Sequence, residues 1–475
     1  MKKALDTIKK FLESPWAMLA ISFLTVLFYC LEIKYFQYCV YSSVFILLII
    51  TKAKWYIAPL NMIMVLVSSR FNGDFSYFNL QSVGFIFDLF FGIILFGFLG
   101  YDLVINFKDY LNSFKKNWLL YSLLFMLASM IISLIYSPVI NLSLMCILGQ
   151  ILTIYIMMII PLKIDFDDMG KRMMILSFIL TIWVIGFECL FVFINVYFIE
   201  KIGIYEIMNQ KLLNLGWAIS NRYVVICNMG LLGCLFWYVN YPDLKNRLFA
   251  LASALFAILI NVFSACRAAY LGLILIIPFI IAFYIYYYVK LDDRSYEKRY
   301  LLSILSAFTL VIVIGFCCGF FQEIFQSVKD YGFSLNGRDA VWQTAINAFH
   351  RHPLIGCGPL SGSYYINIEA GRDYVNNYHN YFFDALATTG IIGLLAFLFF
   401  MYVLIHRCLI KNNSYAIILS ILIVYFLVNG FVDSLFLNYQ LMPIMLMPYA
   451  LLPDNGILKV KNRSFGGKKE MEMVQ

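Results

Sequence analysis

Charged side chains and histidines are scarce in this sequence, and its cysteines follow no disulfide or metal-binding pattern. Only 13% of its 475 residues are Asp, Glu, Lys or Arg, against about a quarter in a typical soluble domain. It has only 4 histidines, and its 11 cysteines lie mostly inside apolar runs, where they act as small hydrophobes. No disulfide framework and no zinc-binding Cys/His spacing is visible, which excludes a small disulfide-stapled fold and a zinc module.

Long apolar runs make up most of the chain instead. Hydrophobic residues account for 63% of it, and stretches near the roughly 20 residues that a spanning helix needs recur from Trp16 to Leu452. We therefore expect an all-α polytopic integral membrane protein of about 14 transmembrane helices. The expected helices lie near residues 15–33, 35–51, 55–68, 82–100, 117–137, 140–160, 172–199, 221–239, 246–262, 266–289, 300–318, 383–405, 414–432 and 437–452.

The Lys and Arg residues predict how these helices are oriented. Basic clusters at 108–116, 163–172, 290–299 and 459–469 fall in alternate connections, and such clusters are retained on the cytoplasmic side of a membrane. Both termini are then cytoplasmic. The net charge of +8 follows from this retention and from attraction to anionic lipid, so it gives no argument for nucleic-acid binding.

This orientation divides the chain into four parts and leaves one large loop outside. The loop is too long to be an economical link, and long loops usually carry function. The parts are an N-terminal transmembrane bundle of about 11 helices at 1–318, the extracytoplasmic loop at 319–382, C-terminal transmembrane helices at 383–452 and a basic cytoplasmic tail at 453–475.

Within the loop, the stretch GRDAVWQTAINAFHRHP predicts a short amphipathic helix at the membrane interface. Pro353 would end this helix, and Gly356 and Gly358 would form the turn after it. The helix is indicated by apolar residues at helical spacing, which are Val341, Ala345, Ala348 and Phe349.

The loop and its neighbouring helices also carry a set of residues in a recognisable order. They are Gly337-Arg338 with Trp342, then Pro353, Gly356 and Gly358, then His379-Asn380 opening a helix with Gly390 and Gly393, and upstream the piece SACRAAYLGL with Arg267. Through these residues the sequence, over roughly 260–400, resembles the O-antigen ligase and O-antigen polymerase superfamily of bacterial envelope glycan assembly.

That resemblance implies several properties of the fold and the reaction. It implies a GT-C-like helical fold in the bacterial cytoplasmic (inner) membrane and a polyprenyl-pyrophosphate-linked glycan as donor on the outer face. It further implies glycosyl transfer with inversion, independent of metal and of any cofactor. The lipid bilayer and other polysaccharide assembly proteins are the expected partners.

Arginine side chains are the candidates for binding the pyrophosphate. A pyrophosphate leaving group accumulates negative charge, which cationic donors can stabilise. Arg338 and Arg267 are the first candidates, Arg222 is a third, and Arg372 faces the predicted outer side and is a candidate for glycan contact. The alternative for each is a side chain that reaches the interface and meets water or lipid headgroups.

His379 is the candidate general base. It lies at the predicted N-terminus of a helix, whose dipole disfavours an imidazolium ion, and a neutral imidazole can accept the proton of a sugar hydroxyl. Asn380 would orient the ring or bind sugar hydroxyls, although Asn is also common at helix starts. His350 and His352 are spaced like two metal ligands but lack further partners, so no metal site is expected.

Between the two branches of the superfamily, the sequence favours the polymerase. A polymerase holds two lipid-linked substrates, so more than one pyrophosphate needs neutralising. The outer cations offered for this are Arg222, Arg267, Arg338, Arg351 and Arg372. The alternatives are ligase-type transfer to a terminal acceptor, a lipid-linked oligosaccharide flippase or other transporter, and a structural subunit of an assembly complex. Asp384 and Asp433 also face the predicted outer side and could contact glycan, while Asp88 and Glu188 lie within apolar runs; none of the four receives a role.

Overall fold

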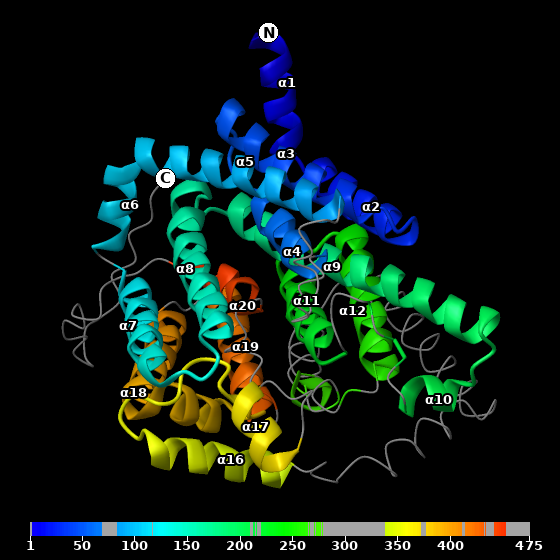
Figure 1. Ribbon diagram of the computed structural model, residues 1–475. Helices are drawn as coiled ribbons and strands as arrows, with labels where there is room; N and C mark the ends of the chain where they lie inside the picture. The colour runs from blue at the N-terminus through cyan, green and yellow to red at the C-terminus, as the bar shows by residue number, and fades with distance from the viewer. Residues whose placement is uncertain are drawn as a thin grey trace, which may run out of the picture.

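The computed structural model is helical throughout the residues that it describes, with no strand among them (Figure 1). These are residues 2–68, 83–209, 212–278 and 338–452, except residue 116 and short gaps within 214–219, 265–277, 372–376, 411–413 and 432–440. The expected helix at 300–318 and most of the one at 266–289 lie outside them, as does the tail. Every other range expected to be a helix coincides with one.

The helices of the N-terminal part follow one another with short connections. They are α1 Lys2–Leu12, α2 Pro15–Cys30, α3 Lys34–Thr51, α4 Ala58–Ser68, α5 Val83–Ile105, α6 Phe107–Phe114, α7 Trp118–Ser133, α8 Ile140–Lys163, α9 Asp168–Ile194, α10 Ile204–Asn209, α11 Ser220–Asn240 and α12 Leu244–Phe263. A 3₁₀ turn at Leu134–Tyr136 follows α7, and a π turn at Asn195–Ile199 follows α9. The C-terminal helices are α16 Arg338–Arg351, α17 Gly362–Ala370, α18 Tyr381–Ile410, α19 Ser414–Gly430 and α20 Leu441–Ala450.

Length and composition support a polytopic membrane protein. Among the described residues, 6 helices are long and apolar enough to cross a membrane, or 7 if the bent pair α1 and α2 counts as one span. Helices α4, α19 and α20 match expected spans in position, but with 11, 17 and 10 residues they are shorter than a spanning helix needs. The described residues therefore do not establish the expected count of about 14 helices.

One continuous apolar core holds the bundle together, built chiefly from α4, α8, α9, α11, α19 and α20. A second, smaller core lies where α16 and α17 pack on α18. In Figure 1, α16 lies across the lower end of the bundle with α17 beside it, and α6 lies at the upper end. We call these the α16 end and the α6 end.

Helix α16 is the amphipathic helix expected in the large loop. Its buried residues are Val341, Thr344, Ala345 and Ala348, which recur at helical spacing and face the smaller core. Phe349, expected on the same face, is only partly buried. The helix therefore packs its apolar stripe on protein, directly against α18.

Helix α18 is broken at Gly390, whose backbone has φ 65° and ψ −163°. The break separates an outer half, residues 381–389, from the long inner half. Residues 353–358, which follow α16, lie in this break and bind its free backbone groups. Irregular backbone in a membrane bundle needs such partners, because there is no water in the hydrocarbon region to bind it.

Candidate functional site

Two residues far apart in the sequence meet at the α16 end, where α18 begins and α19 ends. The ring of Tyr381 packs flat against Gly430, since a Cβ added there would lie 1.9 Å from a ring carbon. Asn380 Nδ2 donates to the carbonyl of Phe431 at 3.3 Å. These contacts bring the residue before Asn380 beside the residues after α19, so His379 and Asp433 come into contact.

Within the described part of the chain, the His379 ring is hydrogen-bonded through Nδ1. Its Nδ1 lies 3.2 Å from Asp433 Oδ1. Asp433 Oδ2 accepts a second hydrogen bond, from Asn221 Nδ2 at 2.8 Å. Because an ionised carboxylate only accepts, Nδ1 carries a proton, and in the neutral form of the ring Nε2 then has the lone pair. The geometry therefore sets the tautomer that a general base needs.

Asp433 is held in its ionised form. Its side chain is 4% exposed, and burial alone would raise the pKa of the carboxyl. The hydrogen bonds with His379 and Asn221 and the positive charge of Arg338 outweigh burial, so the pKa of Asp433 lies below its ordinary value of 3.8. The carboxylate is thus charged across the whole neutral range.

The backbone at His379 adopts a left-handed conformation, with φ 51°. Such a conformation costs a non-glycine residue on the order of 1 kcal/mol and often marks a functional position. It turns the chain directly before α18. Asn380 then caps the helix, since its Oδ1 accepts from the amides of Phe382 at 2.9 Å and Phe383 at 3.2 Å. Both ends of the Asn380 amide are engaged with the protein, so its proposed contact with sugar stays a prediction.

Arginines lie in the first turns of two helices near this end. Arg338 is the first residue of α16, is partly exposed, and lies close enough to lower the pKa of Asp433. Arg222 is in the first turn of α11, directly after Asn221. Asn221 Oδ1 also accepts from Cys266 Sγ at 2.9 Å, and Cys266 precedes Arg267 in the sequence. Arg267 itself and Arg372 lie outside the described residues.

Arg351, expected as a further cation for pyrophosphate, has its charge engaged by a neighbouring helix. Its guanidinium forms an ion pair with Glu369 of α17 and covers the ring of Tyr365 at 4.6 Å. Asn347 Nδ2 donates to the same carboxylate at 2.9 Å. Arg351 therefore joins α16 to α17 and brings no uncompensated charge to the site.

Sequence reasoning missed two members of the site. Asp433 was noted as an acidic residue on the outer side but given no role, and Asn221 was passed over beside Arg222. An acidic residue next to a helix end in a chain so poor in charge was the available signal. Of the other unassigned acids, Asp384 is buried one turn into α18 and Glu188 is fully buried in α9, while the side chain of Asp88 lies outside the described residues.

The two remaining loop histidines have ordinary surroundings. His350 is exposed at the end of α16. The ring of His352 stacks on Tyr136, with centroids 3.8 Å apart and planes 12° apart. In the described part of the chain, no three His, Cys, Asp or Glu side chains gather in a geometry that would hold a metal ion.

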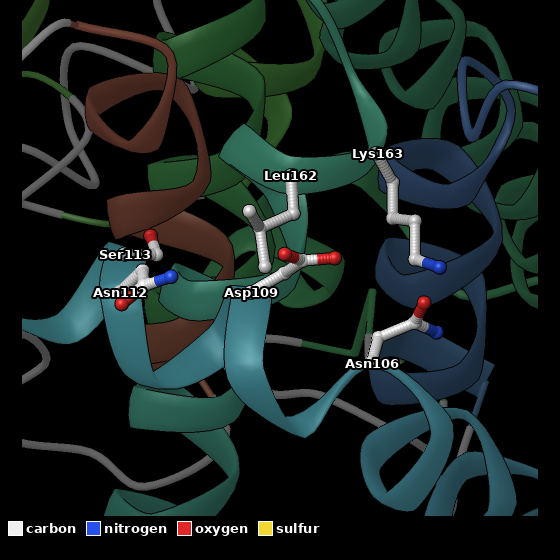
Figure 2. A pocket seen from close by; sticks show the side chains of 6 residues that line it. All are labelled: Asn106, Asp109, Asn112, Ser113, Leu162 and Lys163. Atoms are coloured by element: carbon white, nitrogen blue, oxygen red, sulfur yellow. The ribbon is translucent and has the colours of Figure 1, made fainter.

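A cavity of about 380 Å³ lies at the α6 end, far from these residues (Figure 2). It is formed by α6 and the last residues of α8, and it contains none of the side chains expected at the site. Its lining residues are Asn106, Asp109, Asn112, Ser113, Leu162 and Lys163. The chemistry-bearing residues thus gather at the α16 end, where their contacts define a site independently of this cavity.

Comparison with known families agrees with the sequence. Residues 251–398 match the family model described as O-antigen ligase. This match covers α16, α17, His379 and most of α18, and it confirms the resemblance to the O-antigen ligase and polymerase superfamily. It supports a function in O-antigen ligase-type or related polysaccharide assembly. No match is found among curated proteins.

Proposed function

We propose that this protein transfers a polyprenyl-pyrophosphate-linked glycan to a sugar hydroxyl, with His379 as general base. The observation that carries the proposal is the contact of His379 Nδ1 with Asp433, beside Arg338. This contact leaves Nε2 of the neutral ring as a proton acceptor, and Arg338 lies within electrostatic reach of the same carboxylate. A base next to an anion-binding group is what transfer from a pyrophosphate requires.

In the proposed reaction, Nε2 of His379 takes the proton of the acceptor hydroxyl as its oxygen attacks the anomeric carbon of the donor. The bond between that carbon and the pyrophosphate oxygen breaks, and the bonding electrons leave with the pyrophosphate. Attack from the face opposite the leaving group inverts the anomeric centre. Arg338, with Arg222 and Arg267, stabilises the leaving charge, while Asp433 stabilises the imidazolium that forms.

Within this class we favour the polymerase, which transfers a growing lipid-linked glycan onto another lipid-linked repeat unit. Arg338 on α16 and Arg222 on α11 approach from separate helices, and Arg267 follows a residue bound to Asn221. Cations on separate elements suit two pyrophosphate groups better than one. Ligase-type transfer to a terminal acceptor is the second candidate, and the name of the matching family favours it.

The location of the polar residues argues against a flippase as the main function. A transporter gathers its polar groups near the middle of the bilayer, where substrate and ions bind. Here the histidine, the carboxylate and the described arginines of the site lie at or beyond the ends of α11, α16, α18 and α19. This placement favours chemistry at one face of the bundle.

The decisive experiment supplies the purified protein in lipid with polyprenyl-pyrophosphate-linked repeat units extracted from the source cells. A ladder of longer lipid-linked chains is expected, and no product of any length would refute glycosyl transfer. Deletion of the gene distinguishes a polymerase from a ligase. Single repeat units without longer chains are expected for a polymerase, whereas normal ladders that fail to reach their terminal acceptor would identify a ligase.

A further inference from the structure

Residues 353–358 take the place of a helical turn in α18. A continuous helix would pair the amide of Ile391 with the carbonyl of Ala387, and that of Ile392 with Thr388. Instead, those two amides donate to the carbonyls of Pro353 and Leu354, at 2.9 and 3.2 Å.

The two carbonyls released by the break have new partners as well. The carbonyl of Ala387 accepts from the amide of Cys357 at 2.9 Å, and the carbonyl of Thr388 accepts from the amide of Gly358 at 2.8 Å. All four groups are therefore satisfied by one inserted segment, which matters because a free backbone group in a dry bundle is costly.

Glycine makes this insertion sterically possible. Gly390 has φ +65°, and a Cβ there would lie 2.4 Å from the carbonyl oxygen of Leu354. Gly356 has φ +72°, and a Cβ there would lie 2.4 Å from the backbone carbon of Thr388. Both positions face backbone, which has little freedom to move aside. A methyl group at either one would push the inserted segment and α18 apart.

The same segment is bound to the rest of the protein on both sides. It follows α16 directly, so it connects to Arg338 through one rigid helix. On the other side, the hydroxyl of Ser143 on α8 donates to the carbonyl of Pro359 at 2.6 Å. A Cβ on Gly358 would lie 2.5 Å from the Cβ of Ser137, so the chain fits closely there too.

We propose that residues 353–358 are a positioning segment for the transfer reaction, which rests on the proposed function. Inserted in the break, the segment fixes the outer half of α18, and with it His379, relative to α16 and Arg338. If the segment withdrew, Gly390 would return to helical angles and the outer half would take another direction. The base and the pyrophosphate-binding arginine would then lose their alignment.

The test compares Gly390→Ala with Gly371→Ala in the purified full-length protein. Gly371 is the control for a methyl group at positive φ, because its φ is +63° and no atom lies within 4 Å of an added Cβ, although its ψ of 35° is less restrictive than the −163° of Gly390. We expect Gly390→Ala to lower kcat about 100-fold, the order of loss that small misplacement of reacting groups causes. The KM of Gly390→Ala for lipid-linked repeat units should stay within about twofold of the wild-type value. Both kcat and KM of Gly371→Ala should also stay within about twofold of wild type. Equal kcat in the two variants would overturn the proposal.

Hydrogen exchange supplies a readout that does not depend on activity. In the wild type, peptides covering 353–358 and 387–392 should exchange slowly, since their amides are bonded across the break. Gly390→Ala should speed exchange in both peptides, and Gly371→Ala in neither. An inactive wild type would refute the proposed function, whereas an active wild type with fast exchange at 353–358 would refute only the positioning segment.

A second variant covers the case that Gly390→Ala does not yield folded protein. Gly358→Ala should lower kcat, because its methyl group meets the Cβ and Oγ of Ser137. The φ of +89° at Gly358 strains the backbone of an Ala there as well, so exchange should also become faster in the peptide covering 353–358. Full activity of folded Gly358→Ala would overturn the proposal.

Discussion

Replacing Asp433 with Asn tests the proposed base most directly, because the change keeps size, removes the charge and replaces one acceptor oxygen with an N–H donor. In the wild type, the two carboxylate oxygens accept from His379 Nδ1 at 3.2 Å and from Asn221 Nδ2 at 2.8 Å. An Asn has a single acceptor oxygen. If that oxygen keeps the shorter bond to Asn221, its amide nitrogen faces His379 and forces the proton onto Nε2.

The expected cost follows from losing general-base catalysis. Proton transfer by a positioned side chain contributes about 10² to 10⁴ in rate, which equals about 3 to 5 kcal/mol in the barrier. Asp433→Asn should therefore lower kcat by that factor and leave the KM for the lipid-linked substrate nearly unchanged. The assay is the rate of chain elongation by purified protein in lipid.

A swapped pair distinguishes a tautomer effect from general damage. In Asn221→Asp/Asp433→Asn, the new Asn donates its amide to the new carboxylate, so its oxygen faces His379 again. Cys266 Sγ can still donate to residue 221. The double variant should recover a substantial part of the lost rate. Near-normal activity of Asp433→Asn, or a swap no better than the single variant, would refute the assigned role.

Three further outcomes are expected. His379→Ala should abolish transfer with normal expression and insertion, and near-normal product chains would contradict the base. Arg338→Lys should lose most of its activity, because an ammonium lacks the bidentate fork that suits phosphate. Arg351→Lys should keep its activity, since Arg351 pairs with Glu369. Equal losses in the two variants would contradict a specific role for Arg338. Between pH 5 and 7, activity should not follow the titration of the Asp433 carboxyl, whose pKa lies below 3.8. The stabilising contribution of this carboxylate is complete above about pH 3.8, and so throughout this interval, and it is lost only as the pH falls through the lowered pKa. An acidic limb between pH 5 and 7 that is present in the wild type and absent from Asp433→Asn would instead implicate the carboxyl.

The positions of α16 and of the long apolar helices were predictable from the sequence because each one is a local property. Runs of apolar residues, Pro353 and the spacing of Val341, Ala345 and Ala348 depend only on neighbours along the chain, and α16 and the described apolar helices coincide with them. The shorter helices α1, α6, α10 and α17 were not expected. The family match likewise depends on a short, ordered motif.

The break in α18 and the partner of His379 could not be predicted in the same way. The glycines at 356, 358 and 390 were visible, but their partners lie across the fold, and a turn was the simpler interpretation of the first two. The contact of His379 with Asp433 spans 54 residues and depends on how Tyr381 packs on Gly430. Only the packed structure brings these residues together.

The different exposure of the two paired residues also resolves an electrostatic difficulty. A carboxylate close to a pyrophosphate would repel it, and repulsion would weaken substrate binding. Here the Asp433 side chain is 4% exposed, whereas that of His379 is 26% exposed. The substrate therefore meets the imidazole and the partly exposed guanidinium of Arg338, while the buried carboxylate accepts hydrogen bonds from His379 and Asn221. A buried acid beneath an accessible base lets the site receive an anionic donor and still stabilise the positive charge that the base gains during transfer.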